Sequence, residues 1–427
     1  MILYTAAHGG FSREAVPLGG GAAVFEHLIE EWTRTRPFEF RAITPAILGR
    51  GAPTGRELVR FGERDYARFC REFERACTQE ILRHDPATTA VLVNDVSEGP
   101  DFAAIAARGF PVFTIYHVDV VAYVSSIYLR GWIRPETTVR WYRRFSALLP
   151  EMAKLVWAKQ EASVMHSRGL IVPSEGMREV MLRCYPECPR EKIQVLPWGI
   201  WGTRDGGDPV SPDSLRAEFG VPADARVLLT LSRISPEKGQ DLLLKALLDW
   251  ERRDDFSEHP LWVFICGDAA FMQGVRFLET LRSLAARLRR TRVIFPGYVT
   301  GARKRAFFAL ADLYVFPSRH ESYGLTLLEA LAAGLPAVCL DHHGARTVMR
   351  EEFGELVRPS ELHSAIARLL ADDHRRRQMG QAARRFALQE KFSDRAAQLA
   401  ALMTEAIAER SAPAAQPDRL PPTSTTR

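Results

Sequence analysis

The chain alternates, almost from end to end, between short runs of β-branched and aromatic residues and longer stretches with helical periodicity. Parallel strands that are buried on both faces have this apolar character, and each needs a helical crossover to the next strand. The alternation therefore predicts an α/β protein built from doubly wound parallel sheets. In the first half the predicted strands are 1–5, 38–45, 90–94, 111–117, 169–173 and 193–197, and in the second half 226–232, 261–267, 291–296, 312–317, 336–341 and 354–358.

A stretch typical of a linker separates the two sets of strands. Residues 198–220 (WGIWGTRDGGDPVSPDSLRAEFG) are rich in Gly, Pro, Asp and Ser and lead into a capped helix. A chain of 427 residues is long enough for two domains. We predict an N-terminal domain over 1–200, a C-terminal domain over 201–393, a last helix over 394–410 and a disordered, proline-rich tail over 411–427.

Composition argues against several classes of protein. With 46% hydrophobic and 26% charged residues the chain is globular, and a net charge of +5 at this length does not indicate nucleic-acid binding. The six cysteines are scattered and have no partners at zinc spacing, so we expect free thiols in a reducing cytoplasm and no metal. The first residues do not resemble a signal peptide, and no run reaches the roughly 20 apolar residues of a membrane span. We expect a soluble, cytoplasmic protein.

Three consecutive glycines follow the first predicted strand. Gly19, Gly20 and Gly21 directly precede a helical pattern, and bare backbone amides at a helix N-terminus suit an anion. The spacing differs from G-x-G-x-x-G because Val24 occupies the last glycine position, which disfavours a dinucleotide cofactor. A flexible turn without a ligand is the alternative.

Charged residues follow other strands at the edge where open α/β sheets bind ligands. Arg233 and Lys238 lie between strand 226–232 and the next helix, although helix N-termini normally favour acids. Two cations there suggest a bound anion such as a diphosphate; a solvated charge pair is the alternative. His117 ends strand 111–117, where a structural histidine is about as common as a functional one.

Two glutamates, Glu321 and Glu329, lie eight positions apart around Gly324. Eight residues of helix advance about 12 Å, whereas a pair of carboxylates acting on one glycosidic bond lies about 5 to 9.5 Å apart. We therefore expect the two side chains to hold opposite ends of one extended ligand, with the amides near Gly324 and Leu325 facing its phosphates. Ordinary charges on a surface helix are the alternative.

Taken together and in this order, these motifs resemble glycosyltransferase family 4, the glycosyl transferases group 1. The resemblance covers most of residues 1–410, and its most specific part is the E-x7-E motif within PSRHESYGLTLLEALAAGLPAV. SRISPEKG and the PGYV at 296–299 support it. It implies a GT-B fold, in which two Rossmann-like domains face each other across a cleft and the helix 394–410 crosses back to the N-terminal domain.

The resemblance also implies a site for a nucleotide-diphosphate sugar. One part departs from the family pattern: HHGART has His343 at a usual glycine and Thr347 at a usual acid, which leaves the identity of the sugar open. The implied residues are Arg233, Lys238, Gly20, Gly21, Gly324 and Leu325 for the diphosphate, Glu321 and His117 for the sugar, Glu329 for the ribose, and Tyr298 and Val299 for the base.

The implied reaction is transfer of the sugar, with retention of configuration, to an acceptor that is a carbohydrate, a lipid-linked molecule or a small molecule. No D-x-D triplet is present, so we expect Arg233 and Lys238 to replace a metal ion and expect no cofactor. A sugar-nucleotide epimerase, a glycan phosphorylase and a non-catalytic nucleotide-sugar sensor are the alternatives.

The segment 128–159 mixes aromatic residues with Arg and Lys in the half where this family binds acceptors. Such a mixture could contact an anionic lipid surface or a phosphorylated acceptor. A partly buried pair of amphipathic helices with a solvated face is the alternative.

Overall fold

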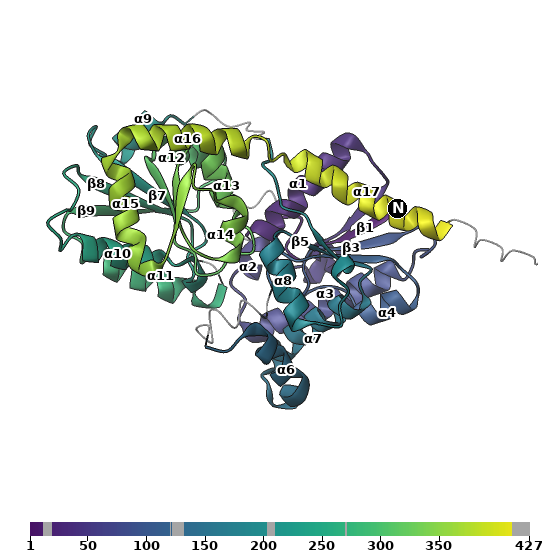
Figure 1. The fold of residues 1–427 in the computed structure, drawn as a ribbon. Helices are drawn as coiled ribbons and strands as arrows, with labels where there is room; N and C mark the ends of the chain where they lie inside the picture. The colour runs from purple at the N-terminus through teal and green to yellow at the C-terminus, as the bar shows by residue number, and fades with distance from the viewer. Residues whose placement is uncertain (12–18, 120, 122–131, 203–209, 270, 412–427) are drawn as a thin grey trace, which may run out of the picture.

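The computed structural model describes residues 1–427 except 12–18, 120, 122–131, 203–209, 270 and 412–427. The described residues form two lobes, each built around a six-stranded parallel sheet (Figure 1). We call the lobe with β1–β6 the first lobe and the lobe with β7–β12 the second lobe. The predicted fold class is confirmed; the tail predicted to be disordered lies outside the described residues except for its first residue.

The first sheet has the strand order β2-β1-β3-β4-β5-β6. Every residue of β1, β3, β4 and β5 is buried, which explains the unbroken apolar runs in the sequence. The strands are β1 Ile2–Thr5, β2 Phe40–Ile43, β3 Ala90–Val93, β4 Val112–Ile115, β5 Gly169–Val172 and β6 Ile193–Val195.

The second sheet has the order β12-β11-β10-β7-β8-β9, so its first strand in sequence lies in the interior. Each of the twelve predicted strands corresponds to one of the observed strands, usually with one or two residues fewer at its ends. The strands are β7 Arg226–Leu231, β8 Leu261–Cys266, β9 Thr291–Gly297, β10 Leu313–Phe316, β11 Ala337–Leu340 and β12 Gly354–Val357.

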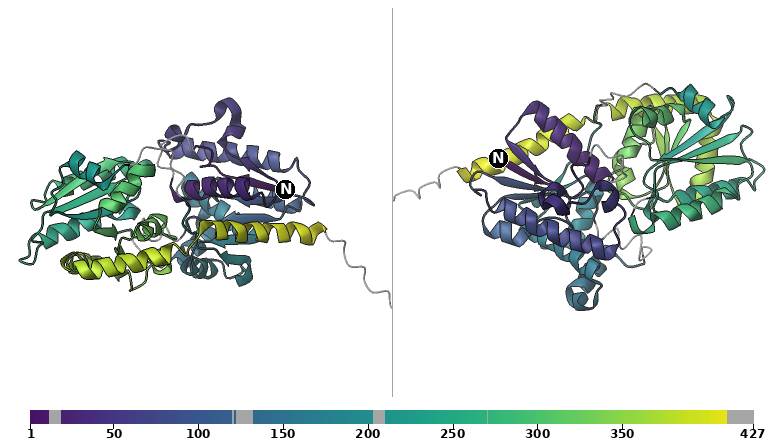
Figure 2. Two further views of the ribbon diagram at one scale, coloured as in Figure 1. Left: turned by 90° about the horizontal axis from the view of Figure 1, so that it is seen from above. Right: turned by 180° about the vertical axis from the view of Figure 1, so that it is seen from behind.

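Helices cover both faces of each sheet (Figures 1 and 2). The helices of the first lobe are α1 Gly20–Thr35, α2 Gly55–Leu58, α3 Glu63–Ile81, α4 Phe102–Ala107, α6 Pro135–Phe145, α7 Glu151–His166 and α8 Glu175–Cys184. Those of the second lobe are α9 Pro212–Phe219, α10 Gln240–Trp250, α11 Phe271–Ala285, α12 Gly301–Leu310, α13 Leu325–Ala332, α14 His343–Val348, α15 Leu362–Ala371 and α16 Asp373–Ala387. Short 3-10 turns are η1 Pro45–Gly51, η2 Ser146–Leu148, η3 Arg190–Lys192, η4 Pro236–Lys238 and η5 Pro359–Glu361.

The last described helix, α17 Phe392–Ser411, returns from the second lobe to the first, where it lies beside α1 (Figures 1 and 2). The indole N–H of the buried Trp32 donates to the Ala396 carbonyl at 3.1 Å, and Arg168 pairs with Glu409. The predicted crossing back is thereby confirmed. All six cysteines are free, as expected, and all six are buried.

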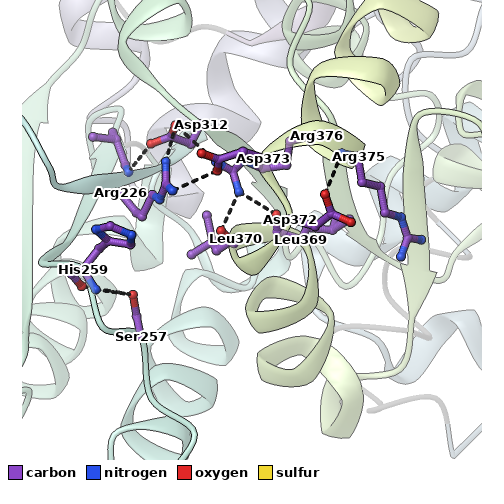
Figure 3. Close-up of polar contacts among 11 residues, drawn as sticks. Arg226, Ser257, His259, Asp312, Leu369, Leu370, Asp372, Asp373, Arg375 and Arg376 are labelled. Carbon is purple, nitrogen blue, oxygen red and sulfur yellow. Dashed lines mark hydrogen bonds and ion pairs between the residues drawn. The ribbon is translucent and has the colours of Figure 1, made fainter.

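A buried arginine joins α15 and α16 to the start of the second sheet (Figure 3). Arg376, 6% exposed, donates to the carbonyls of Leu369 and Leu370 at 2.8 and 2.5 Å and also pairs with Asp373. Asp373 in turn binds Arg226 of β7 at 2.8 Å. One guanidinium therefore satisfies the open carbonyls at the end of α15 and fixes the next helix on the sheet.

Replacing Arg376 with Ala is expected to lower the free energy of unfolding by about 2 kcal/mol, because buried carbonyls lose their donors and a buried ion pair is broken. Urea unfolding of the whole chain would measure the change. The neighbouring Arg375 is 47% exposed and contacts Glu355 at 3.4 Å, so Arg375→Ala is the matched control. It should change stability by less than about 0.5 kcal/mol, and equal losses in the two variants would contradict the assignment.

Candidate active site

A cavity of about 520 Å³ lies between the lobes, lined by residues that follow strands of both sheets. All eleven residues that the family resemblance assigned to the nucleotide-sugar site line this one cavity. This is the edge at which open α/β sheets bind ligands. The placement brings the predicted residues together; their individual roles remain predictions.

Two helix N-termini open into this cavity without a side-chain cap from any described residue. Helix α1 begins after Gly19 (φ 102°) and helix α13 begins after Gly324 (φ 103°), both in a conformation that favours glycine. Uncapped N-termini leave several N–H donors without partners, at the positive end of the helix dipole. The two helices therefore direct two sets of donors at one cavity, an arrangement that suits a diphosphate.

The glycine loop also lies too close to its neighbours for larger residues. A Cβ on Gly21 would lie 2.9 Å from Cδ2 of His117, and one on Gly20 would lie 3.0 Å from Cδ1 of Leu325 in the other lobe. The Cβ position of Gly19 is 3.7 Å from Nε of Arg233. The glycine backbone of the first lobe thus lies against Arg233 and Leu325 of the second lobe.

Lys238 and Glu321 form an ion pair at 2.6 Å, and each side chain is 15% exposed. Ser318 donates a second hydrogen bond to the same carboxylate oxygen at 3.1 Å. Burial alone would raise the pKa of Glu321, but the Lys238 ammonium outweighs it and holds this pKa below its usual value. Glu321 is therefore ionised at neutral pH, next to a fixed cation. Sequence analysis assigned Lys238 and Glu321 separate roles, and in the structure the two side chains form one pair.

Glu321 lies in the loop before α13, whereas Glu329 lies on that helix. The helical advance of about 12 Å expected between the two glutamates therefore does not apply, because Gly324 redirects the chain between them. Glu329 instead pairs with Lys304 of α12 at 2.7 Å. Each glutamate thus has its own lysine, which supports the prediction that the two do not act on one atom.

Lys304 was not singled out from the sequence, although it lies near the N-terminus of α12, the kind of position that drew attention to Lys238. It lines the cavity together with Tyr298, a 42% exposed side chain, and the buried Val299. Burial, with a smaller contribution from the nearby Glu329 carboxylate, raises the pKa of Tyr298. Tyr298 therefore keeps its hydroxyl proton at neutral pH.

His117 is held by Asn94 at the end of β3. Its Nε2 lies 3.0 Å from the Asn94 Oδ1, which also accepts a hydrogen bond from Tyr4 at 2.8 Å. Because the Asn94 amide nitrogen donates to the Gly21 carbonyl at 3.3 Å, its oxygen must accept from His117. Burial lowers the pKa of His117 to about 4. The imidazole is therefore neutral, with its proton on Nε2.

A second group of polar residues on the cavity wall was missed from the sequence. His8 follows β1, and its Nδ1 lies 3.2 Å from an oxygen of Asp95, which follows β3. The Tyr66 hydroxyl of α3 lies 3.1 Å from Nε2 of His8 and donates to Glu98. Their positions just after strands were a usable signal for His8, Asp95 and Glu98, whereas Tyr66, in the first turn of α3, gave no such signal.

The unusual HHGART segment lies outside the residues that line the cavity. His342 caps α14 by accepting from the Ala345 N–H at 3.1 Å. The Cβ of His343 would lie 2.4 Å from a Cβ on Gly176 of the first lobe, so this histidine packs between the lobes. Thr347 donates to the His343 carbonyl at 3.1 Å. His343 therefore contributes to the contact between the lobes, whereas the Thr347 hydroxyl bonds within its own helix.

Metal and membrane features can be examined only in the described part of the chain. There, no group of three or more His, Cys, Asp or Glu side chains is placed to hold a metal ion. Among the same residues, each helix is either too short or too polar to cross a bilayer.

Residues 212–386 match the model of the family described as glycosyl transferases group 1. A GDP-mannose-dependent alpha-(1-6)-phosphatidylinositol monomannoside mannosyltransferase from Mycolicibacterium smegmatis is 31% identical over 229 residues, 51% of this chain and 57% of that protein. A D-inositol 3-phosphate glycosyltransferase from Corynebacterium efficiens is 33% identical over 207 residues, 47% of each chain. This chain thus spans about half the length of these curated relatives.

Similarity to solved structures extends over both lobes. HepE from Anabaena, in complex with UDP and glucose, superimposes with a TM-score of 0.60 over 95% of this chain and 99% of HepE, at 16% identity. At that identity the similarity shows the fold, and the fold is the one described above (Figure 1). The second lobe is therefore similar to the glycosyl transferases group 1, and the two lobes together have a fold of the GT-B type.

Proposed function

We propose that this protein transfers a sugar from a nucleotide-diphosphate sugar to the hydroxyl of an acceptor. The observation that carries the proposal is the convergence of two uncapped helix N-termini with Arg233 and Lys238 on one cavity. Backbone donors and cations in that arrangement suit a diphosphate. The carboxylates of Glu321 and Glu329 supply acceptors for hydroxyl groups at two separate places.

In the proposed reaction the bond between the anomeric carbon and the phosphate oxygen breaks while the acceptor oxygen bonds to that carbon. The acceptor attacks from the side of the leaving group, and the departing phosphate takes the acceptor proton, so configuration is retained. Negative charge grows on the diphosphate, where Arg233, Lys238 and the two helix N-termini stabilise it more than in the ground state. Glu321 stabilises positive charge on the sugar ring. No metal ion is required in this scheme.

The relatives suggest which nucleotides to test first. One relative is named for GDP-mannose and HepE was solved with UDP, so GDP- and UDP-sugars are the proposed donors. A thermal-shift series with GDP, UDP and their sugars tests this directly. A ligand at 100 times its Kd stabilises the folded state by about 2.7 kcal/mol, which raises the melting temperature. No shift with any nucleotide would contradict the proposal.

Activity assays then separate the alternatives. Transfer that depends on an acceptor supports a glycosyltransferase. Interconversion of the donor without an acceptor would indicate an epimerase, and breakdown of a glycan by phosphate would indicate a phosphorylase. Binding without turnover for every donor and acceptor would favour a sensor.

Replacing Glu329 with Ala is expected to weaken donor binding about tenfold, equivalent to about 1.4 kcal/mol, with a smaller effect on turnover. The variant removes an acceptor for the ribose hydroxyls and leaves Lys304 without its partner at 2.7 Å. Calorimetric titration with the nucleotide that gave the largest thermal shift measures the change in affinity. Glu218→Ala is the matched control, because Glu218 pairs with Arg303 of the same helix α12 at 2.6 Å and does not line the cavity. Undiminished affinity in Glu329→Ala would argue against the ribose role.

We also propose that the α6 region contacts an anionic membrane surface. Helix α6 projects from the edge of the first lobe (Figure 1) and buries only Thr138 and Val139. Apolar side chains around it remain exposed: Trp132 88%, Trp141 55%, Phe145 49% and Leu148 82%. Arg134, Arg140 and Arg144 are exposed beside them. Aromatic and basic side chains on one projection suit the headgroup region of a bilayer. Of the segment 128–159 singled out from the sequence, residues 128–131 lie outside the described residues.

Flotation with vesicles of phosphatidylglycerol and phosphatidylcholine tests this contact. We expect binding that increases with the anionic fraction and weakens between low and high salt. A Trp141→Ala, Leu148→Ala double variant should lose most of it while still binding nucleotide. Equal recovery with and without vesicles would support the alternative of a solvated helix pair.

A further inference from the structure

One wall of the active-site cavity comes from the first lobe alone and carries two carboxylates for which the donor has no evident use. Asp95 and Glu98 both line the cavity, and Glu98 is only 5% exposed. Tyr66 links them through His8: its hydroxyl contacts Nε2 of His8 and donates to Glu98, while Nδ1 of His8 faces Asp95 at 3.2 Å. We call Asp95, Glu98, His8 and Tyr66 the acceptor wall.

Glu98 differs from the other carboxylates of the cavity because no cationic group bonds it directly among the described residues. Glu321 has Lys238, Glu329 has Lys304 and Asp95 has His8, whereas Glu98 bonds the neutral hydroxyl of Tyr66. A buried carboxylate without a cation is costly to maintain. A carboxylate has about four hydrogen-bonding positions, and the tyrosine occupies one. A ligand hydroxyl can use those that remain.

The charges along the cavity restrict what that ligand can be. The described lining carries the cationic side chains Arg233, Lys238 and Lys304, with His8 as the fourth when protonated, and the carboxylates Asp95, Glu98, Glu321 and Glu329. Under the proposed function, a bound diphosphate takes Arg233, Lys238 and the helix N-termini. The cations of the described lining that remain are Lys304, which pairs with Glu329 at 2.7 Å, and His8, which pairs with Asp95 at 3.2 Å.

The acceptor wall cannot itself attract a phosphate. The His8 imidazolium lies between Asp95, which balances its charge, and the Tyr66 hydroxyl. Burial raises the pKa of Glu98, although the nearby His8 favours the ionised form and opposes this rise. Ionised, Glu98 accepts from hydroxyl groups and repels an anion; protonated, it still bonds a hydroxyl group and carries no positive charge to balance a phosphate.

Resting on the proposed function, we infer that the acceptor is an uncharged polyhydroxyl compound whose hydroxyls bond Glu98 and Asp95, and that phosphorylated acceptors are rejected. This narrows the acceptor class that the sequence left open, which included phosphorylated molecules. The acceptor wall thereby becomes a specificity determinant separate from the donor residues.

Matched acceptors test the inference on the full chain with its best nucleotide sugar. The pairs are glucose with glucose 6-phosphate, mannose with mannose 6-phosphate, and myo-inositol with inositol 3-phosphate. We expect kcat/KM for the better neutral compounds to exceed that of their phosphates at least about tenfold. A phosphate preferred over its neutral partner overturns the inference. The inference is also overturned if the chain binds its donor and slowly hydrolyses it but transfers the sugar to none of the neutral acceptors.

Variants of the acceptor wall test whether its residues cause the preference for neutral acceptors. Glu98→Gln keeps the oxygen that accepts from Tyr66 and removes the charge, so it should raise the acceptor KM about tenfold, change the donor KM less than about twofold and narrow the discrimination against phosphates. Tyr66→Phe is the second variant and should shift the acceptor KM in the same direction. Glu72→Gln, on the exposed face of α3, is the matched control. An acceptor KM unchanged in Glu98→Gln would overturn the inference, whereas absence of any nucleotide-induced thermal shift would instead contradict the proposed donor site.

Discussion

Replacing Arg233 or Lys238 with Ala is expected to lower turnover at saturating donor about a hundredfold or more in each variant. The reason is that charge-assisted contacts to a leaving group, made mainly in the transition state, contribute roughly 3 kcal/mol each. Both residues line the cavity, and Lys238 is already fixed at 2.6 Å from Glu321. Donor binding should weaken less than turnover. Steady-state kinetics with separate donor and acceptor titrations measures both.

The exposed Arg253, just beyond the end of α10, provides the control for removing one positive charge from the second lobe. Arg253→Ala should leave turnover within about twofold of the unmodified chain. If both Arg233→Ala and Lys238→Ala retained full turnover, the proposed stabilisation of the leaving diphosphate would be wrong. If only Lys238→Ala were affected, the lysine would act mainly through Glu321.

The elements of the fold could be predicted because burial leaves a local trace. Strand β3, Ala90–Val93, is buried at every residue, and its run AVLV is apolar at every position. Helix α13 starts after one glycine and ends before Gly334, which lies in the left-handed region at φ 83°. Such signals lie within about ten residues of one another, so a single sequence contains them.

The pairs in the site could not be predicted, because they depend on which strands are neighbours. Lys238 follows β7 and Glu321 follows β10, and these two strands are adjacent in the second sheet. The two residues themselves are 83 positions apart in the sequence. His8 and Asp95 follow β1 and β3, which are likewise adjacent in the first sheet. Strand order is set by how the crossovers pack, and no local pattern records it. Sequence analysis therefore identified Lys238 and Glu321 only as single residues and missed His8 and Asp95, and the structure shows both pairs.

The two pairs bring opposite charges into corresponding places of the two lobes. In each lobe a cation and a carboxylate from the ends of adjacent strands meet at the cavity. Next to the second-lobe pair are two helix N-termini and Arg233, which suit an anion. Next to the first-lobe pair are Tyr66 and Glu98, which suit hydroxyl groups. The cavity is therefore polarised, with one side that suits an anion and one side that suits hydroxyl groups, and the proposed transfer from a diphosphate to a hydroxyl would use both sides.

The His8–Asp95 pair should make the stability of the protein depend on pH in a way that His8→Gln abolishes. Burial alone would lower the pKa of His8, but Asp95 at 3.2 Å outweighs it and raises this pKa to about 9. In the unfolded chain a histidine titrates near 6.5. Below about pH 6.5 the imidazole is charged in both states, and the stabilisation by the pair is complete. Between about 6.5 and 9 only the folded state keeps the proton, so the stabilisation is lost as the pH rises.

The free energy of unfolding of the unmodified chain is expected to exceed that of His8→Gln by about 3 kcal/mol near pH 6. This difference should fall toward zero above about pH 9. The limit on the acid side comes from Asp95, whose pKa the histidine lowers to about 2 against the effect of burial. Its contribution is therefore kept above about pH 4 and lost only in stronger acid. Urea unfolding of both chains at intervals from pH 5 to pH 9.5 measures the difference. His259→Gln is the control for the loss of an exposed histidine. The His259 hydrogen bond to the Ser257 hydroxyl comes from the backbone N–H, which this substitution keeps (Figure 3). A difference between the unmodified chain and His8→Gln that stayed constant across this range would show that His8 is not held as the cation on the acceptor wall.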